Sequence, residues 1–181
     1  MVEFALFMLK CFYFMLPAYF ANMAPVLVKK INLFVFPVDF GKKISNKRLL
    51  GKNKTFRGLF FGVIFAVAVA YAQFLLYGLE NFRAISLYSY DNWLFFGFLM
   101  GLGALSGDLV KSFFKRRVGI SPGDKFIPFD QVDFVIFSLA FIMPIFSLSI
   151  NMFIASLLIS FLLHIIVNHA AFYLNIRKEK W

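Results

Sequence analysis

The stretch GLFFGVIFAVAVAYAQFLLYGL, Gly58–Leu79, carries no charged side chain and is apolar almost throughout, with Gln73 as the exception. A helix needs roughly 20 apolar residues to cross the hydrocarbon core of a bilayer, so this stretch predicts a transmembrane helix. The whole chain of 181 residues agrees, because it is 61% hydrophobic and only 15% charged, with a mean hydropathy of +0.80. A soluble domain is about 45–50% apolar and about 25% charged. The composition therefore excludes a soluble globular domain, a disordered chain and a secreted disulfide scaffold, and it predicts an all-α integral membrane protein.

Further apolar stretches lie on both sides of this one. The region Phe134–Leu174 is long enough for two crossings only if a tight turn separates them, between Pro144 and Asn151. One long span followed by a re-entrant segment is the competing interpretation of that region. We predict a single membrane domain over residues 1–181 with five transmembrane helices, at residues 4–28, 58–79, 93–114, 134–150 and 152–174.

The basic residues indicate how these helices are oriented. Of the 19 Lys and Arg residues, nine lie in Lys29–Arg57, five in Lys111–Asp133 and three after Leu174. Cytoplasmic loops carry an excess of Lys and Arg, and an odd number of crossings places all three segments on the same side. We therefore expect a multi-pass protein of the cell membrane with its N-terminus outside, its C-terminus in the cytoplasm, and cytoplasmic loops at 29–57 and 115–133. Because the positive charge is confined to loops, no nucleic-acid partner is expected.

The segment GLGALSGDLVKSFFKRRVGISPGDKFIPFDQVD, Gly101–Asp133, is the best candidate for chemistry. Asp108 lies near the cytoplasmic end of an apolar helix, where an ionisable group is costly and usually faces a partner, a cation or water. Lys111, Ser112 and Lys115 follow at positions i+3, i+4 and i+7, on the same helical face. Oxygen ligands beside cations suit a divalent ion that bridges phosphates. The alternatives are a structural ion pair at the helix end and, for Lys115, Arg116 and Arg117, a cluster that only sets the topology.

Asp130 and Asp133 lie three residues apart at the start of the next span. If that helix begins near Pro128, both share a face of its first turn, where free N–H groups and the helix dipole favour anions. Simple N-capping is the alternative explanation. Carboxylates brought to one cytoplasmic surface by two helix ends can form a Mg²⁺ site.

The stretch GKNKTFRG, Gly51–Gly58, is a second candidate. It has glycine at both ends, three cations and the hydroxyl of Thr55, and it could surround phosphate oxygens with N–H groups and cationic side chains. Its spacing does not match the Walker P-loop. A basic loop that binds anionic lipid is the alternative.

Two motifs link these segments to a known family. The chain reads G-D-L-V-K-S-F-F-K-R over Gly107–Arg116 and I-P-F-D-Q-V-D over Ile127–Asp133. This resembles the membrane cytidylyltransferases that activate phosphatidate-like lipids, whose bacterial members, the CDP-diglyceride synthases, read approximately G-D-L-x-E-S-x-x-K-R and I-P-G-H-G-G-x-x-D-R-x-D. Lys111 in place of Glu, Gln131 in place of Arg and the missing G-H-G-G match the archaeal branch, the CDP-archaeol synthases. The K-T-x-R-G loop and the run L-P-A-Y-F-A-N-M-A-P, Leu16–Pro25, are also similar to that branch.

The resemblance implies a nucleotidyltransferase of membrane phospholipid biosynthesis. Its substrates would be CTP and an isoprenoid ether-lipid phosphate, 2,3-bis-O-(geranylgeranyl)-sn-glycerol 1-phosphate, and its products the CDP-lipid and pyrophosphate. Membrane lipids would surround it, and homo-oligomer formation is left open. A small membrane transporter or a lipid-binding subunit without catalysis is the alternative function. A transport path would need polar groups near the midplane, and the second and fourth spans offer almost none.

The expected site residues fall into three groups. In the bacterial relatives the G-D-L aspartate and the first aspartate of D-R-x-D hold the divalent metal, which corresponds here to Asp108 and Asp130. We expect Mg²⁺ on Asp108, Asp130 and Asp133, and expect the catalytic residues to be these three with Lys111 and Lys115. The residues expected to bind CTP or phosphate are Lys52, Lys54, Thr55, Arg57, Ser112, Arg116 and Arg117.

Overall fold

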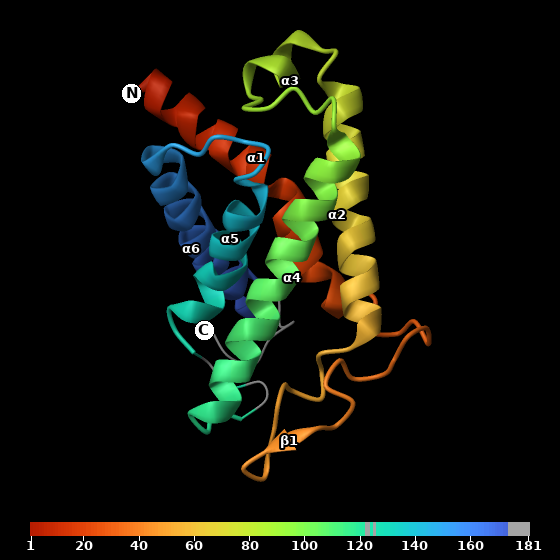
Figure 1. Cartoon of the computed structure of the whole chain (residues 1–181). Helices are drawn as coiled ribbons and strands as arrows, with labels where there is room; N and C mark the ends of the chain where they lie inside the picture. Colours follow the sequence, from red (N-terminus) through yellow and green to blue (C-terminus); the bar gives the residue numbers. More distant parts are fainter. Residues whose placement is uncertain (122–123, 125, 174–181) are drawn as a thin grey trace.

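The chain folds as a bundle of helices with one very small hairpin (Figure 1). The structure is a computed structural model, and it describes residues 1–121, 124 and 126–173. The described elements, in chain order, are α1 (Val2–Leu27), β1 (Lys43–Ile44), β2 (Lys47–Arg48), α2 (Phe56–Leu76), α3 (Glu80–Ala84), α4 (Trp93–Arg117), α5 (Phe129–Ile142) and α6 (Ile150–Tyr173).

Four of the described helices are long and apolar enough to cross a membrane: α1, α2, α4 and the Ile150–Val167 part of α6. The all-helical membrane class predicted from composition is therefore present. α5 differs from the predicted span 134–150, because it begins at Phe129 and ends at Ile142. Pro144 contributes to the early end because it has no N–H with which to continue the helical hydrogen bonds, and the next N–H, that of Ile145, donates to the carbonyl oxygen of Ile142 only three residues back. With 14 residues, or about 21 Å, α5 is shorter than a hydrocarbon core of about 30 Å. The count of five crossings stays a prediction.

α4 is the central helix, and glycines on two of its faces let its neighbours approach closely. A Cβ at Gly97 would lie 2.7 Å from the Cα of Val67 in α2, and one at Gly103 would lie 2.5 Å from the Cα of Ser138 in α5. Small residues at such positions allow membrane helices to pack backbone to backbone. Gly107, one turn after Gly103, is equally close to α5, since a Cβ there would lie 2.6 Å from the carbonyl oxygen of Asp133.

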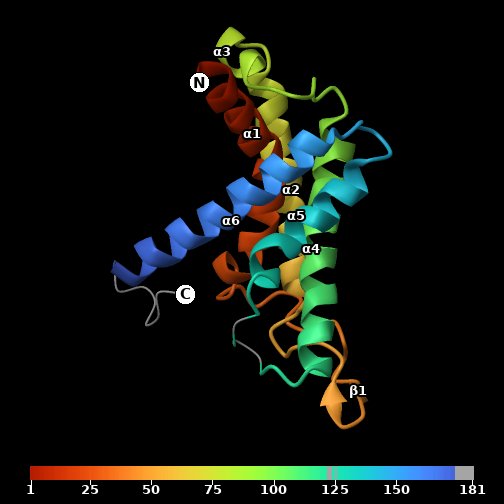
Figure 2. The ribbon, with the colours of Figure 1, turned by 90° about the vertical axis from the view of Figure 1, so that its left-hand side faces the viewer.

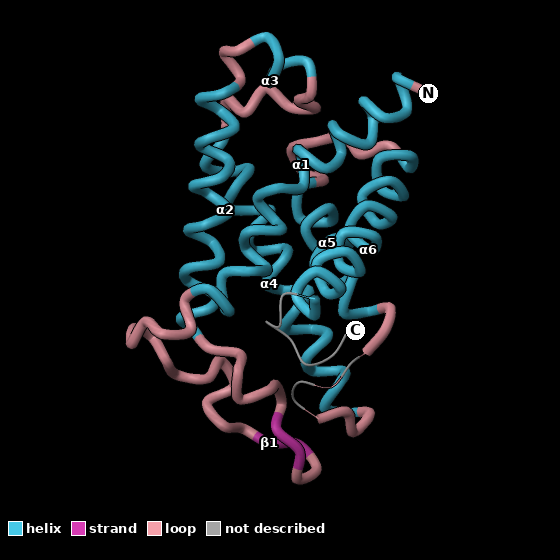
Figure 3. The backbone as a smooth tube through the Cα atoms, turned by 180° about the vertical axis from the view of Figure 1, so that it is seen from behind, coloured by secondary structure: helices cyan, strands magenta, loops and turns pink. Residues whose placement is uncertain are grey.

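The loops sort to the two ends of the bundle (Figures 1 and 3). The long loop between α1 and α2, with the hairpin in it, lies at the end where α4 terminates, whereas α3 lies at the opposite end. α6 leans away from the other helices (Figure 2). The described parts of the basic segments 29–57 and 111–133 thus meet at one end, as the charge distribution predicts, and the third basic segment, after Leu174, lies outside the described residues.

The hairpin was not expected from the sequence. β1 and β2 pair antiparallel, with Lys43 opposite Arg48 and Ile44 opposite Lys47. Ser45 and Asn46 join them with positive φ angles of 49° and 63°, the conformation of the tight turns that suit two-residue hairpin loops. Within the described residues, the structure is therefore all-α except for this hairpin and one isolated bridge between Pro37 and Thr55.

Candidate functional site

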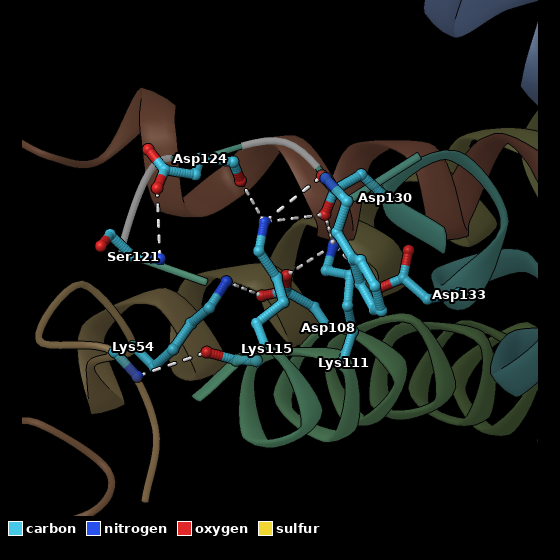
Figure 4. A network of polar contacts seen from close by, with 11 residues as sticks. Lys54, Asp108, Lys111, Lys115, Ser121, Asp124, Asp130 and Asp133 are labelled. Carbon is cyan, nitrogen blue, oxygen red and sulfur yellow. Dashed lines mark hydrogen bonds and ion pairs between the residues drawn. The ribbon is translucent and has the colours of Figure 1, made fainter. Parts of the chain in front are cut away.

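Three carboxylates from two helices surround one ammonium group at the loop-rich end of the bundle (Figure 4). The Nζ of Lys111 lies 3.3 Å from an oxygen of Asp108, 3.3 Å from one of Asp130 and 3.0 Å from one of Asp133. The predicted approach of carboxylates from the ends of two helices, now α4 and α5, is thus present. We call this group, with Lys54 and Lys115, the acid–lysine cluster.

Local structure explains why these four side chains meet. Asp108 and Lys111 lie three positions apart on α4 and so share one face. Asp130 and Asp133 lie in the first turns of α5, where Asp130 also accepts a hydrogen bond of 2.7 Å from the N–H of Phe126. The close contact at Gly107 brings the backbone of Asp133 directly onto α4 beside Asp108.

Two further lysines complete the cluster. Lys54, from the loop before α2, contacts Asp108 at 2.5 Å. Lys115 lies 3.3 Å from both carboxylate oxygens of Asp130 and donates to the carbonyl oxygen of Asp124. Three positive charges therefore face three negative charges in a partly buried site.

Beside this cluster lies a cavity of about 310 Å³ that four cations line: Lys47, Arg48, Lys52 and Arg116. Gly51 and Ser121 are also in its wall. The N–H of Gly51 donates to the Oγ of Ser112 at 3.3 Å, which fixes the loop to α4 between the cavity and the acid–lysine cluster. Of the predicted phosphate-binding residues, Lys52 and Arg116 lie in this cavity and Lys54 lies in the cluster. Lys47 and Arg48 were not expected as site residues.

The other predicted phosphate-binding residues have different contacts in the described structure. Thr55 is the N-cap of α2, and its side chain accepts from the N–H of Gly58. Arg57 donates to the carbonyl oxygen of Ile31 at 2.6 Å. Arg117 donates to three backbone carbonyls of the hairpin, those of Ile44, Lys47 and Arg48. These contacts hold loops in place, and none of them joins the acid–lysine cluster.

Asp39 anchors the loop that carries the hairpin. Its carboxylate accepts from the N–H groups of Gly41 and Leu50, at 2.9 and 3.1 Å, and from Arg48 at 2.8 Å. Burial by itself raises the pKa of Asp39, but these hydrogen bonds and the charge of Arg48 outweigh it and hold the pKa below its usual range. The anchor therefore depends on an ionised Asp39.

The three carboxylates expected to bind Mg²⁺ are of the right chemical type, but the ammonium group of Lys111 lies between them. Carboxylate oxygens are the ligands that Mg²⁺ prefers, and within the described residues the carboxylate of Asp133 has Lys111 as its ion-pair partner. The Nζ of Lys111 occupies the point on which the three carboxylates converge. Accordingly, no group of three or more His, Cys, Asp or Glu among the described residues is arranged to hold a metal ion as it stands.

Comparison with known proteins identifies close relatives. A protein-family model described as CarS-like, CDP-archaeol synthase, matches residues 4–181. The CDP-archaeol synthase of Pyrobaculum islandicum is 35% identical over 166 residues, which cover 91% of this chain and 93% of the relative. That of Thermococcus kodakarensis is 38% identical over 176 residues, 94% of each chain. The solved structure of an intramembrane enzyme for archaeal membrane lipid biosynthesis has a TM-score of 0.72 and 30% identity, covering 86% of this chain and 90% of its own.

Proposed function

The chain belongs to the CDP-archaeol synthase family, and we propose that it transfers the CMP unit of CTP to an isoprenoid ether-lipid phosphate. The substrate would be 2,3-bis-O-(geranylgeranyl)-sn-glycerol 1-phosphate, and pyrophosphate would be released. The observation that carries this proposal is the acid–lysine cluster at the end of α4, because it combines cations for phosphates with carboxylates for a metal ion. Neither a transporter nor a lipid-binding subunit accounts for that combination.

The reaction needs little proton transfer. An oxygen of the lipid phosphate bonds to the α-phosphorus of CTP, the bond from that phosphorus to the bridging oxygen of the β-phosphate breaks, and the electron pair leaves with pyrophosphate. Since the nucleophile is already an anion, the barrier is mainly the repulsion between negative groups. Catalysis then comes from neutralising charge and positioning the reactants in line.

The acid–lysine cluster supplies both effects. Lys54, Lys111 and Lys115 would exchange their carboxylate partners for phosphate oxygens when CTP binds. Asp108, Asp130 and Asp133 would then hold Mg²⁺, which when bound neutralises triphosphate charge and the developing charge of the leaving group. Lys111 is the residue that must leave the centre for this to happen.

The proposed topology follows from the loops. We propose five crossings, with α5 and the segment up to Ser149 as the fourth, the N-terminus outside and the site facing the cytoplasm. The two long basic loops lie at one end of the bundle, and the α3 end carries a single basic residue, Arg83, between α2 and α4. This distribution supports the orientation under the positive-inside rule.

One assay tests the function directly. Purified protein would be incubated with radiolabelled CTP, Mg²⁺ and either the geranylgeranyl ether phosphate or a phosphatidate of ordinary acyl chains. We expect a labelled CDP-lipid with the first lipid and little or none with the second. Absence of any CTP-dependent lipid product with either substrate would overturn the proposal.

A further inference from the structure

The segment that follows α1 exposes large apolar side chains. We call residues 30–43 the apolar arm, and its exposed large apolar residues are Ile31, Leu33, Phe34, Val35, Phe36 and Phe40. Phe36 and Phe40 are the most exposed of these, at 63% and 69%. The chain between α1 and the hairpin extends sideways past the end of α2, drawn orange-red in Figure 1 and pink in Figure 3. So many exposed apolar groups in one short segment mark an interaction surface.

The charges of the apolar arm add a second property to this surface. Lys30 precedes the apolar residues, and Lys42 and Lys43 follow them. All three lysines are exposed, and none forms an ion pair with another described residue. The one acidic residue of the arm, Asp39, is buried and paired with Arg48. The surface of the arm is therefore apolar in the middle and positively charged at both ends.

The apolar arm is continuous with a surface that faces lipid. The ring of Phe34 lies 5.2 Å from that of Phe60, and the ring of Phe40 lies 5.4 Å from that of Phe56, measured between ring centroids. Phe56 and Phe60 are exposed and one turn apart at the start of α2, a helix long and apolar enough to cross a membrane. Since the crossing begins at Phe56, these ring contacts place the arm at the level where the hydrocarbon core begins.

The backbone of the apolar arm is bonded to the loop that carries Lys54. The N–H of Val38 donates to the carbonyl oxygen of Lys54 at 2.8 Å, and the N–H of Phe56 donates to the carbonyl oxygen of Phe36 at 3.0 Å. Lys54 in turn contacts Asp108 in the acid–lysine cluster. A displacement of the arm is therefore passed directly to the backbone of Lys54.

We propose that the apolar arm docks on the membrane surface beside the site, with its phenylalanines at the boundary between headgroups and hydrocarbon and its lysines on anionic lipid headgroups. Docking of this kind strengthens with the apolar area buried and with the charge of anionic lipids, and salt weakens the electrostatic part. Because the arm is bonded to the backbone of Lys54, docking holds this lysine in place beside Asp108. The docking is independent of the proposed function, whereas its effect on turnover rests on that function.

A nitroxide label measures the depth of the arm without any turnover. The label would be attached to Phe36→Cys, or to Ser45→Cys in the hairpin turn as the control, with the buried Cys11 replaced by Ala in both proteins. The proteins would be placed in vesicles of phosphatidylcholine, with or without phosphatidylglycerol as the anionic lipid. We expect the label at position 36 to be accessible to oxygen and shielded from a water-soluble relaxation agent, more so with phosphatidylglycerol. The label at position 45 should stay accessible to the water-soluble agent.

A triple variant, Lys30→Gln, Lys42→Gln and Lys43→Gln, tests the charge of the arm. At saturating CTP and low salt, we expect phosphatidylglycerol to raise CDP-lipid formation by the unaltered protein at least about threefold, and that by the triple variant less than about 1.5-fold. Added salt should reduce the first effect toward the second. Arg83→Gln is the control, because it removes a cation at the opposite end of the bundle and should keep the response of the unaltered protein.

Each outcome bears on one part of the proposal. A label at position 36 that is as accessible to the water-soluble agent as the label at position 45 would overturn the docking. Spectral broadening between labels at position 36 would mean that a second copy of the chain covers the arm, which also overturns it. A docked label with the same phosphatidylglycerol response in the triple variant and the unaltered protein would overturn the link to Lys54. If the unaltered protein forms no CDP-lipid, the proposed function fails and the depth measurement still decides the docking.

Discussion

Gly107 of α4 faces the carbonyl oxygen of Asp133 in α5 so closely that a Cβ at position 107 would lie 2.6 Å from it. This contact sets the separation of the two helices at the level of Asp108, the residue next to Gly107. The acid–lysine cluster therefore depends on a residue that has no functional group.

Gly107→Ala should disturb both stability and activity. Because the methyl group would meet backbone atoms, α5 must shift, and overpacking of this kind costs about 1–3 kcal/mol. We expect a lower unfolding temperature in detergent and a loss of CDP-lipid formation. Gly78→Ala is the matched control, since its methyl group would only reach the carbonyl of Leu75 at 3.8 Å. Equal behaviour of the two variants would contradict the proposed role of the close contact.

Asp108→Asn should abolish turnover while the protein still folds. The amide keeps the shape of the side chain but loses the charge that pairs with Lys54 and Lys111. A fall in the rate of CDP-lipid formation of at least about 10²-fold is expected, as for other groups that stabilise charge in a transition state. Asp91→Asn, an exposed aspartate in the loop before α4, is the control and should retain full activity. Near-normal turnover in Asp108→Asn would defeat the assignment.

Lys111→Met tests whether a divalent ion can occupy the centre of the cluster. Lys111 is the only cation that contacts Asp133 in the described structure, so its loss leaves a buried carboxylate unpaired and should cost about 3–5 kcal/mol. Added Mg²⁺ should restore part of this loss and raise the unfolding temperature of Lys111→Met more than that of the unaltered protein. Lys29→Met, in the exposed loop after α1, is the control. If the unaltered protein, Lys111→Met and Lys29→Met all show the same change in unfolding temperature with Mg²⁺, the acid–lysine cluster does not hold a metal ion.

Arg117→Ala should release the hairpin from α4, because Arg117 donates to three of its carbonyls. We expect faster amide exchange over residues 43–48 and a higher CTP concentration for half-maximal rate, since Lys47 and Arg48 line the cavity from this hairpin. Arg117→Lys should rescue this effect only partly, because one ammonium group cannot replace a planar guanidinium that reaches several acceptors. Unchanged exchange in Arg117→Ala would show that other contacts dock the hairpin.

The loop anchor at Asp39 should be sensitive to acid. The folded-state pKa of Asp39 lies below the ordinary value for an aspartate, which is about 3.9. Ionised Asp39 therefore stabilises the folded loop fully when the pH is above that ordinary value. This contribution disappears as the pH falls through the lowered pKa. Protection of the amides of Gly41 and Leu50 against exchange should therefore drop at low pH. In Asp39→Asn the protection should already be reduced at pH 7 and should show no such acid-dependent step. An acid-dependent step that persists in Asp39→Asn would assign the titration to another group.

The features of the site that could be predicted from the sequence are mainly those that depend on helical periodicity. The shared face of Asp108, Ser112 and Lys115 follows from their spacing, and that part of the site is present. The approach of Asp130 and Asp133 to the same point was inferred from their place at a helix start. The distance between the helices could not be inferred in this way, because it depends on how Gly103 and Gly107 meet α5.

The loop between α1 and α2 was beyond sequence reasoning for a different reason. Strands of two residues have no periodic pattern, so neither the hairpin nor the position of Lys47 beside Arg116 could be inferred. Thr55 carried a readable signal, since a threonine directly before an apolar helix is a common N-cap. The prediction treated its hydroxyl as a phosphate ligand, although in the structure it accepts from Gly58.

α4 is held tightly on two sides, by α2 at Gly97 and Gly101 and by α5 at Gly103 and Gly107. Such interlocked backbones cannot slide past one another without unpacking, so these three helices behave as a rigid frame through the catalytic cycle. Any rearrangement that ligand binding requires is therefore easier in the loop between α1 and α2 than in the packing of these three helices.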